Sequence, residues 1–293
     1  MSPLSSAAAP LAALALLVPG LCAAQGVAAN RAAPNGSAAA GAVALEVRPR
    51  AGDTVSVRLE QRVEMTGTRR IDGRDSTARV TSSMVMFART IVESVTPEHS
   101  VVATHTDSVR LETSDDHAQA MRADAIRALT GTVSRLRILP DGTGQSIDSA
   151  LGAQSANLVA VMPATLPDTP VAVGGRWTRT MPIPATNAAR GAGEVRAVFR
   201  LDSLTEGGRF AWISMKGSMR RDERAPVGGS GESAGAVSGS ISGVMTLDRR
   251  RGWIVSALTD MTVRSTVTTA NAPAVPLRVT VRVIQKMHAD GQD

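Results

Sequence analysis

Residues 54–66 read TVSVRLEQRVEMT, and hydrophobic and polar side chains alternate along this stretch. The apolar side chains on one side of an extended chain are those of Val55, Val57, Leu59, Val63 and Met65. The charged side chains fall on the other side. This period of two predicts a β-strand of about 13 residues, roughly 40 Å long at ~3.3 Å per residue, with one buried face and one wet face.

The same alternation recurs in four further stretches of the chain. Their apolar sides carry Val101, Ala103, Val109 and Leu111; Val195, Ala197, Phe199 and Leu201; Val255, Ala257, Met261 and Val263; and Leu277, Val279, Val281 and Val283. Parallel strands read instead as continuous apolar runs, so the alternation favours an antiparallel sheet. We therefore expect a mainly β (α+β) fold, with long antiparallel strands in a curved sheet or half-barrel.

Two segments have the spacing of helices instead. From Ser114, apolar residues recur at helical intervals as far as Gly131, which predicts a helix near residues 115–130 with Ser114 as N-cap. A second helical pattern runs from Asp148 to Pro163, inside a helical connection over residues 146–169. The fold should thus contain two short helices.

Short motifs of the first half recur in the same order in the second half. The pairs are Gly52–Val55 with Gly174–Trp177, Val92–Thr96 with Leu201–Thr205, and Leu139–Gly144 with Leu247–Gly252. They predict two related β-units, residues 43–145 and 170–288. The alternative is chance, because hairpins rich in Val, Thr and Gly resemble one another.

The N-terminus has the pattern of a secretory signal. An apolar run from Leu11 to Val18 is followed by the small residues Cys22-Ala23-Ala24, which predicts a signal peptide over residues 1–24, cleaved after Ala24. The run is shorter than the ~20 apolar residues of a membrane-spanning helix. We expect export to the periplasm or cell envelope, a flexible linker over 25–42 and a short tail over 289–293. The segment lacks the usual basic residues at its start, so an Ala-rich tail is the alternative.

Cys22 is the only cysteine, and it lies within the predicted signal peptide. A lipoprotein signal would need a small residue before it, where Leu21 stands, although acylation of Cys22 stays open. Without Cys22, the mature chain has no disulfide, no thiolate nucleophile and no cysteine ligand for a metal.

The chain has a net charge of +6, and aromatic residues make up 2% of it, with no tyrosine. Proteins that bind single-stranded nucleic acid combine a basic groove with stacking aromatics, so we expect no nucleic-acid partner. Weak attraction to anionic lipid headgroups stays open. The few aromatics also disfavour a transmembrane β-barrel, which carries an aromatic girdle at each interface.

No catalytic or metal-binding pattern stands out. Gly231–Gly235 reads GESAG, a G-x-S-x-G match that would make Ser233 a nucleophile, but its surroundings are a Gly/Ser-rich loop. Asp260 and His288 are the partners that the chain order of such hydrolases allows. The histidines form no close ligand pair, and no phosphate-binding or dinucleotide motif is present. We expect no enzyme, no metal and no cofactor, with a secreted serine hydrolase as the less favoured alternative.

One phrase supports a resemblance. LPDTPVAVGGRW, residues 166–177, followed by hairpins and a D-x-x-x-G-W turn at Asp248–Trp253, resembles a family of bacterial exported β-rich proteins of unknown function. The layout is also similar to the periplasmic lipoprotein-carrier half-barrel. That similarity implies a concave face that carries an acyl chain or another apolar group.

Methionine and aromatic residues are the candidates for lining such a face, because methionine adapts to irregular ligands. They are Met84, Met86, Trp177, Phe199, Trp212, Met215 and Met261. The alternative for each is an ordinary core residue. The favoured partner is a lipid or another apolar small molecule. The runner-up is a structural module that binds an envelope protein and no ligand. Alternation alone does not distinguish a hollow half-barrel from a packed sandwich.

Overall fold

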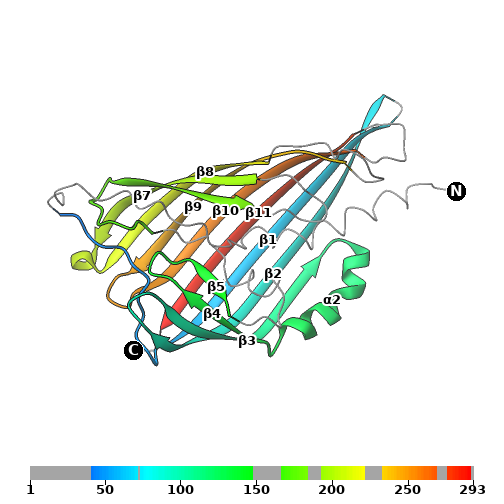
Figure 1. The fold of residues 1–293 in the computed structure, drawn as a ribbon. Coiled ribbons are helices and arrows are strands. Elements are labelled where there is room, and N and C mark those ends of the chain that lie inside the picture. Colours follow the sequence, from blue (N-terminus) through cyan, green and yellow to red (C-terminus); the bar gives the residue numbers. More distant parts are fainter. Residues whose placement is uncertain are drawn as a thin grey trace.

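The computed structural model describes residues 41–71, 73–147, 166–183, 193–221, 233–268 and 276–291. In these residues, eleven strands form one antiparallel sheet (Figure 1). The strands are β1 (Thr54–Ile71), β2 (Arg74–Val95), β3 (Ser100–Thr113), β4 (Val133–Ile138), β5 (Gly144–Ser146), β6 (Arg176–Ile183), β7 (Gly193–Thr205), β8 (Phe210–Arg221), β9 (Ser233–Asp248), β10 (Trp253–Thr268) and β11 (Leu277–Gly291). The prediction of a mainly β, antiparallel fold is confirmed.

The strand order is β5-β4-β3-β2-β1-β11-β10-β9-β8-β7-β6. Strands consecutive in the chain are therefore neighbours in the sheet, except β5 and β6, and the first and last strands pair with each other in the middle. The edges are β5 and β6, which do not pair, so the sheet is not closed into a barrel. Figure 1 shows the sheet curving so that both edge regions turn toward one side. We call that side the concave face. The description of the sheet as a half-barrel of two units stays a prediction.

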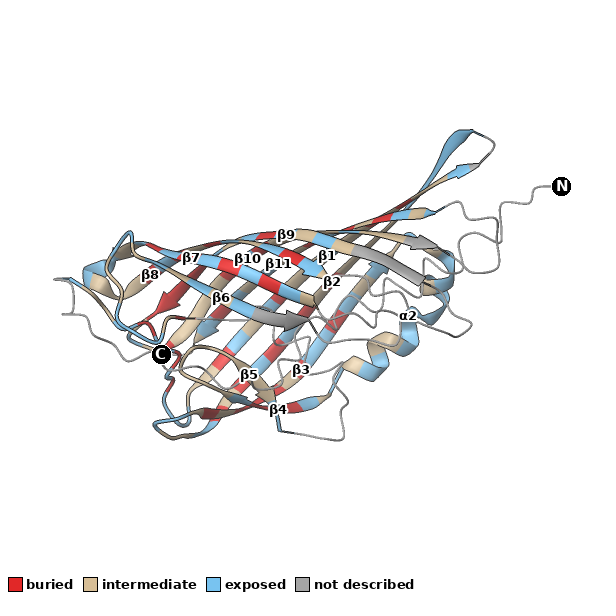
Figure 2. Ribbon diagram, turned by 45° about the horizontal axis from the view of Figure 1, so that its top comes forward, coloured by how far each residue is buried: buried red, intermediate tan, exposed pale blue. Residues whose placement is uncertain are grey.

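The alternation predicted for the central strands is confirmed. Leu59, Met65 and Val281 are at most 5% exposed and lie on the concave face, whereas their neighbours in sequence lie on the outer face. Figure 2 shows buried and exposed positions alternating along these strands. Full burial of an aliphatic side chain of this size stabilises by about 1.5–3 kcal/mol, so this pattern fixes which face points inward.

The face predicted for the first part of β3 is wrong. Phe87 pairs with Ser108 but Ala88 pairs with Thr106, so Asp107 is an extra residue in the strand. This bulge reverses the alternation. Val102, rather than Val101 and Ala103, therefore shares the concave face with Val109, since Val102 pairs with Val92 and Val109 with Met86.

The first helix is confirmed as α2 (Asp116–Leu129). Its N-cap is Asp115, not the expected Ser114: the Asp115 carboxylate accepts a hydrogen bond from the Ala118 N–H at 2.7 Å. Ser114 Oγ instead accepts one from the Thr81 N–H. Pairing of β3 with β4 ends at His105, and α2 lies beside the rest of β3 (Figure 1). No residue of α2 is buried, so the helix contributes little to the core.

The second predicted helix lies largely at residues 148–165, outside the described residues. Ser146 ends β5, and residues 166–169 are not helical. The described part of the chain thus holds one α-helix and one 3-10 turn, η2 (Glu206–Gly208), rather than two helices. The predicted signal peptide, and the linker up to residue 40, also lie outside it. β11 continues to Gly291, so the expected tail begins inside a strand.

One corner of the chain is repeated in the two halves. The Gly52 N–H donates to the Val92 carbonyl at 2.9 Å, and the Gly174 N–H donates to the Leu201 carbonyl at 2.7 Å. The return bonds recur as well: the N–H groups of Val92 and Leu201 donate to the residues that follow the two glycines. A bulge follows each corner, between Val92 and Ser94 and between Leu201 and Ser203. The predicted duplication would explain this recurrence but stays a prediction.

Residues 43–48, which we call the strap, tie the two edges of the sheet together at one end. Val43 exchanges two backbone hydrogen bonds with Val171, which precedes β6. The Val47 N–H donates to the Pro140 carbonyl, in the turn between β4 and β5, at 2.8 Å. The Arg48 N–H donates likewise to the Gly252 carbonyl. A side chain at position 252 would collide with the Arg48 carbonyl oxygen. This end of the molecule is therefore closed by backbone bonds.

Candidate functional site

The register places one continuous row of side chains across the concave face. From β6 to β3 this transverse row reads Trp177, Phe199, Met215, Gly243, Thr259, Gln285, Gln61, Met84 and Leu111. Four of the seven residues predicted to line a ligand site thus fall in one row. The sequence contains no direct sign of this alignment, because the residues come from nine different strands.

The end of the row near the strap is packed core. The rings of Trp177 and Phe199 stack with centroids 5.7 Å apart and planes 9° apart. Phe199 is 0% and Met215 2% exposed, and both belong to a buried cluster with Leu45 and Val47 of the strap. At this end the core interpretation of the candidates holds, because the strap supplies a second layer over the sheet.

The part of the concave face away from the strap is organised differently. Met65 forms a buried cluster with three valines of β11, and Met261 packs against it. Every described residue in or against this cluster belongs to the sheet itself. Met84 and Met86, 8% and 3% exposed, form a neighbouring cluster with Leu59. This methionine-rich area is the candidate site for an apolar ligand.

A polar segment interrupts the row at its centre. Gln61 pairs with Gln285, and Gln285 pairs with Thr259, so three polar side chains lie side by side on the concave face. Thr259 is 7% exposed, and its hydroxyl oxygen is buried without a hydrogen-bond partner among the described residues. Sequence reasoning missed these residues, although each one interrupts an otherwise regular alternation, which is the signal that could have found them.

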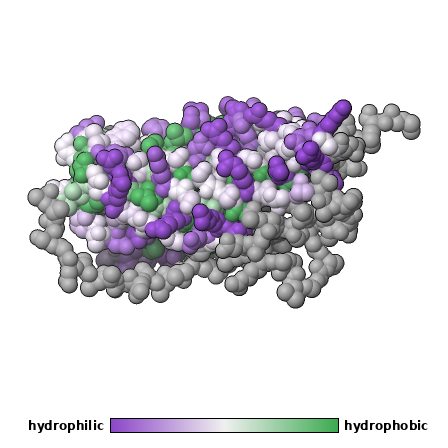
Figure 3. All heavy atoms as spheres, turned by 90° about the horizontal axis from the view of Figure 1, so that it is seen from above, coloured by the Kyte–Doolittle hydropathy of each residue, from purple (hydrophilic) through white to green (hydrophobic). Residues whose placement is uncertain are grey.

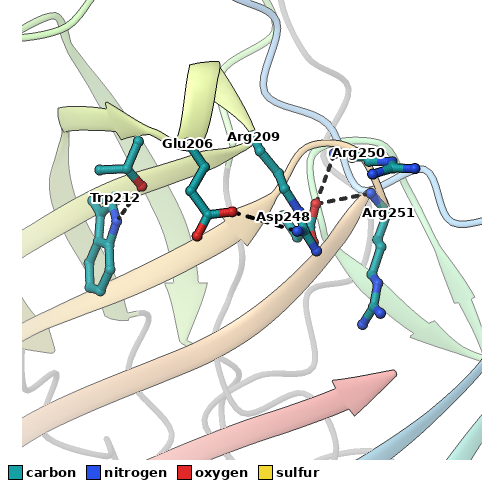
Figure 4. Close-up of polar contacts among 7 residues, drawn as sticks. Glu206, Arg209, Trp212, Asp248, Arg250 and Arg251 are labelled. Atoms are coloured by element: carbon teal, nitrogen blue, oxygen red, sulfur yellow. Dashed lines mark hydrogen bonds and ion pairs between the residues drawn. The ribbon is translucent and has the colours of Figure 1, made fainter. Parts of the chain in front are cut away.

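Trp212 does not join the other candidates. It is 45% exposed on the outer face, and its Nε1 donates to Thr205 Oγ1 at 3.3 Å (Figure 4). Its neighbours Ala211 and Ile213 are buried on the concave side, and alternation sends the intervening side chain the opposite way. The assignment of Trp212 to a concave ligand site is therefore wrong.

Trp212 lines instead a shallow groove of about 350 Å³ on the outer face, together with Val244 and Leu258. These three side chains are between 39% and 46% exposed. Lys286 and His288 form part of the rim. Elsewhere on this face arginines pair with carboxylates, for example Arg282 with Asp260. Figure 3 shows hydrophilic side chains interspersed with small hydrophobic patches.

A second pocket, of about 520 Å³, opens beside the strap. Four arginines and one carboxylate line it: Arg50, Arg209, Arg250, Arg251 and Asp53. This excess of guanidinium groups gives the pocket a positive charge, which would suit an anionic group.

Asp248 is the buried anchor behind this pocket (Figure 4). Its Oδ2 accepts a hydrogen bond from Arg209 at 2.8 Å, and its Oδ1 accepts one from each backbone N–H of Arg250 and Arg251. Burial raises the pKa of this carboxyl, but these hydrogen bonds outweigh burial and hold its pKa below the usual value. Asp248 therefore stays ionised at neutral pH and fixes the turn between β9 and β10.

The residues of the hydrolase alternative do not come together. Ser233 begins β9, which runs on as a strand rather than into a helix, and pairs with Thr268. Asp260 lies eight residues along β10 from that point, about 26 Å away at ~3.3 Å per residue. Within the described residues no group of three or more potential ligands could hold a metal ion, and no helix is long and apolar enough to cross a membrane.

The sequence matches no protein-family model and no curated protein. Among solved structures, the outer membrane protein OprG of Pseudomonas aeruginosa is similar with a TM-score of 0.24 and 6% identity, over 83% of this chain and 98% of that one. An outer membrane channel of Pseudomonas putida F1 has a TM-score of 0.23 and 10% identity, over 89% and 100% of the two chains. A Bacteroides fragilis protein with a YmcC-like fold has a TM-score of 0.14 and 7% identity, over 81% of this chain and 98% of that one.

TM-scores of this size do not establish a shared fold. The resemblance to a family of exported β-rich proteins stays a prediction.

Proposed function

We propose that this protein is a non-enzymatic protein of the bacterial cell envelope that binds an apolar ligand, a lipid or acyl group, on its concave face. One observation carries the proposal: the cluster around Met65 is buried, yet every described residue that packs in or against it belongs to the sheet. Export rests on the N-terminal sequence, whose apolar run and small residues have the pattern of a signal peptide.

The physical argument compares the two ends of the concave face. Apolar surface gains about 25 cal/mol for each Å² removed from water, so an apolar face needs a partner. Near β7 and β8 the strap residues Leu45 and Val47 provide that partner. Near β1 and β11 no described residue outside the sheet takes that place, and a bound acyl chain could pack against the partly buried Met261, Val63 and Val80 at the border of the Met65 cluster. Methionine suits this role because its unbranched, polarisable side chain adjusts to different shapes.

The absence of enzymatic activity is part of the proposal. It is supported by the separation of Ser233 from Asp260 along the strands. His288 lies on the outer face, where its Nε2 is 2.9 Å from a carboxylate oxygen of Asp290. Labelling with a fluorophosphonate should therefore leave the protein unmodified. Labelling that disappears on Ser233→Ala would instead support a serine hydrolase.

The test uses two adjacent residues that face opposite sides of β10. Met261 packs on the concave face and Thr262 lies on the outer face. The wild-type protein and the variants Met261→Glu and Thr262→Glu are purified from bacterial envelopes, and the organic extract of each is analysed by mass spectrometry. We expect lipid from the wild type and from Thr262→Glu, and a severalfold loss from Met261→Glu. If the wild type yields no lipid and takes up none that is added, the proposal is overturned.

A second candidate function rests on the outer face. The groove lined by Trp212, Val244 and Leu258 exposes apolar side chains, which are the usual anchors of protein interfaces. A protein-interaction module would therefore use this face and need no ligand. A pull-down from envelope extract should then recover a partner with the wild type but not with Trp212→Ser. The recovery of the same proteins by both would remove this candidate.

A further inference from the structure

We propose that Gln61, Gln285 and Thr259 bind an uncharged hydrogen-bonding group of the ligand, such as the carbonyl of an ester or amide that carries the acyl chain. The inference rests on the proposed function, because it identifies which polar group an apolar ligand presents to the concave face. It predicts an acyl ester or acyl amide rather than a plain hydrocarbon.

The three side chains form a compact group. The register pairs Gln61 of β1 with Gln285 of β11, and Gln285 with Thr259 of β10, all on the concave face. Directly opposed residues of neighbouring strands have Cβ atoms about 4.5–5.5 Å apart. One small polar group of a ligand could therefore contact two or three of these side chains at once.

Their hydrogen-bonding capacity is unused within the described residues. The Thr259 hydroxyl oxygen is buried and makes no hydrogen bond, and the residue is 7% exposed. The side-chain amides of Gln61 and Gln285 make no hydrogen bond to a described residue either. Buried polar groups of native proteins are nearly always paired, so an unpaired hydroxyl at this position needs an explanation. A ligand that accepts a hydrogen bond there provides one.

The surroundings select an uncharged group. On one side the row is flanked by Leu59, Met287 and Ala257, and on the other by Val63, Val283 and Met261. None of these side chains is charged, and an ionised group among them would lose its hydration without gaining a counterion. An ester or amide carbonyl needs only donors, which the glutamine amides and the threonine hydroxyl supply.

Gly243 adds space next to Thr259. It faces Thr259 across the β9–β10 pair and Met215 across the β8–β9 pair. Having no side chain, it leaves the flexible Met215 side chain as the neighbour of Thr259 on that side. A Cβ at this position would lie 2.6 Å from the Leu258 carbonyl oxygen and 3.4 Å from the Met215 methyl group. A ligand group would therefore reach the buried Thr259 hydroxyl by displacing the Met215 methyl group, which an unbranched side chain allows.

The experiment compares two ligands of similar length, methyl palmitate and octadecane, as competitors of the apolar fluorescent probe N-phenylnaphthylamine. With the wild-type protein we expect the ester to compete about tenfold more strongly than the alkane, which corresponds to one hydrogen bond. This preference should fall in Thr259→Val and in the double variant Gln61→Leu/Gln285→Leu, and should reach about one when the three substitutions are combined. Thr262→Val, on the outer face, should keep the full preference.

Thermal unfolding separates binding from a structural role. Replacing an unpaired buried hydroxyl by a methyl group of the same shape should leave the melting temperature of Thr259→Val unchanged or raised. A lowered melting temperature together with an unchanged ester preference would show that the row serves the fold and overturn the inference. Equal competition by ester and alkane in the wild type would overturn it while leaving the proposed function intact. If neither ligand displaces bound probe, both the inference and the proposed function fail.

Discussion

Val92 in β2 and Leu201 in β7 stand at the same corner in the two halves of the chain. Each exchanges backbone hydrogen bonds with the two residues just before the preceding strand, and each is followed by a bulge. Their packing differs. Leu201 lies in the large cluster that the strap covers, whereas Val92 lies in a small cluster with Val102 and Leu136.

The turns at the same end of the sheet repeat this contrast. The Asp141 carboxylate accepts one hydrogen bond, from the Thr143 N–H, in the turn between β4 and β5. Asp248, in the turn between β9 and β10, is 1% exposed and accepts hydrogen bonds from Arg209 and from two backbone N–H groups. Similar local geometry therefore carries different stabilisation in the two halves, because tertiary contacts decide how deeply each corner and each turn is buried.

We expect the largest difference in lost unfolding free energy between substitutions of the two aspartates. Asp248→Ala leaves two turn N–H groups without their acceptor and removes the buried carboxylate that binds the Arg209 guanidinium, and should cost about 4 kcal/mol of unfolding free energy. Asp141→Ala removes one turn hydrogen bond and should cost about 1 kcal/mol. Urea denaturation at pH 7 measures both. Equal losses would contradict the idea that the second half holds the more tightly built turn.

The corner residues should show the next largest difference. Leu201→Ala opens a cavity in the large cluster and should cost about 3 kcal/mol. Val92→Ala removes less apolar volume from a smaller cluster and should cost about 2 kcal/mol. The comparison uses the same denaturation assay, with the denaturant slope checked for a change of the unfolded state. A larger loss of unfolding free energy in Val92→Ala than in Leu201→Ala would contradict the expectation that the corner in the second half is the more strongly stabilised.

The lowered pKa of Asp248 predicts that the unfolding free energy falls at acid pH. Asp141→Ala should keep this pH dependence. The hydrogen bonds to Asp248 hold its pKa in the folded protein below that of the unfolded chain, about 3.9. Its stabilisation is therefore present above about pH 4 and is lost as the pH falls further, because the unfolded chain then binds more protons. The stability gap between the wild type and Asp248→Ala should narrow from pH 7 to pH 3; a constant gap would argue against an ionised Asp248.

The smallest and most equal effects are expected at the two corner glycines. Gly52 and Gly174 have φ angles of +88° and +85°, which glycine adopts far more readily than other residues. Alanine at either position should cost about 1–2 kcal/mol, since neither site is crowded. Two equal losses, measured by thermal unfolding, would support a shared backbone geometry. A loss at only one would show that the corners merely look alike.

Much of the architecture was predictable because alternation is a local property. The faces of β1 and β11, and that of β10 beyond the bulge at Val255, follow from the order of apolar and polar residues alone. The face of β3 was mispredicted at Val101 and Ala103, since the bulge at Asp107 depends on the register with β2. Trp212 was misassigned because hydrophobicity was considered without its alternation with Ala211 and Ile213.

The candidate site was only partly predictable. Met84, Met86 and Met261 could be named from their residue type, but Gln61, Thr259 and Gln285 become a group only through the pairing of three strands. No spacing along the chain connects positions so far apart. Their unpaired hydrogen-bonding groups also become visible only with the sheet assembled, because whether a hydroxyl is buried depends on its neighbours.

The sequence by itself determined the class of the fold, the inward face of most long strands, the helix after β3 and the absence of cysteine after residue 22. These are consequences of composition and of a two-residue period. Only the tertiary structure decided that β1 pairs with β11, that the strap closes one end, and which of two similar corners lies in the large core. Those outcomes depend on contacts between residues far apart in the chain, which no local pattern encodes.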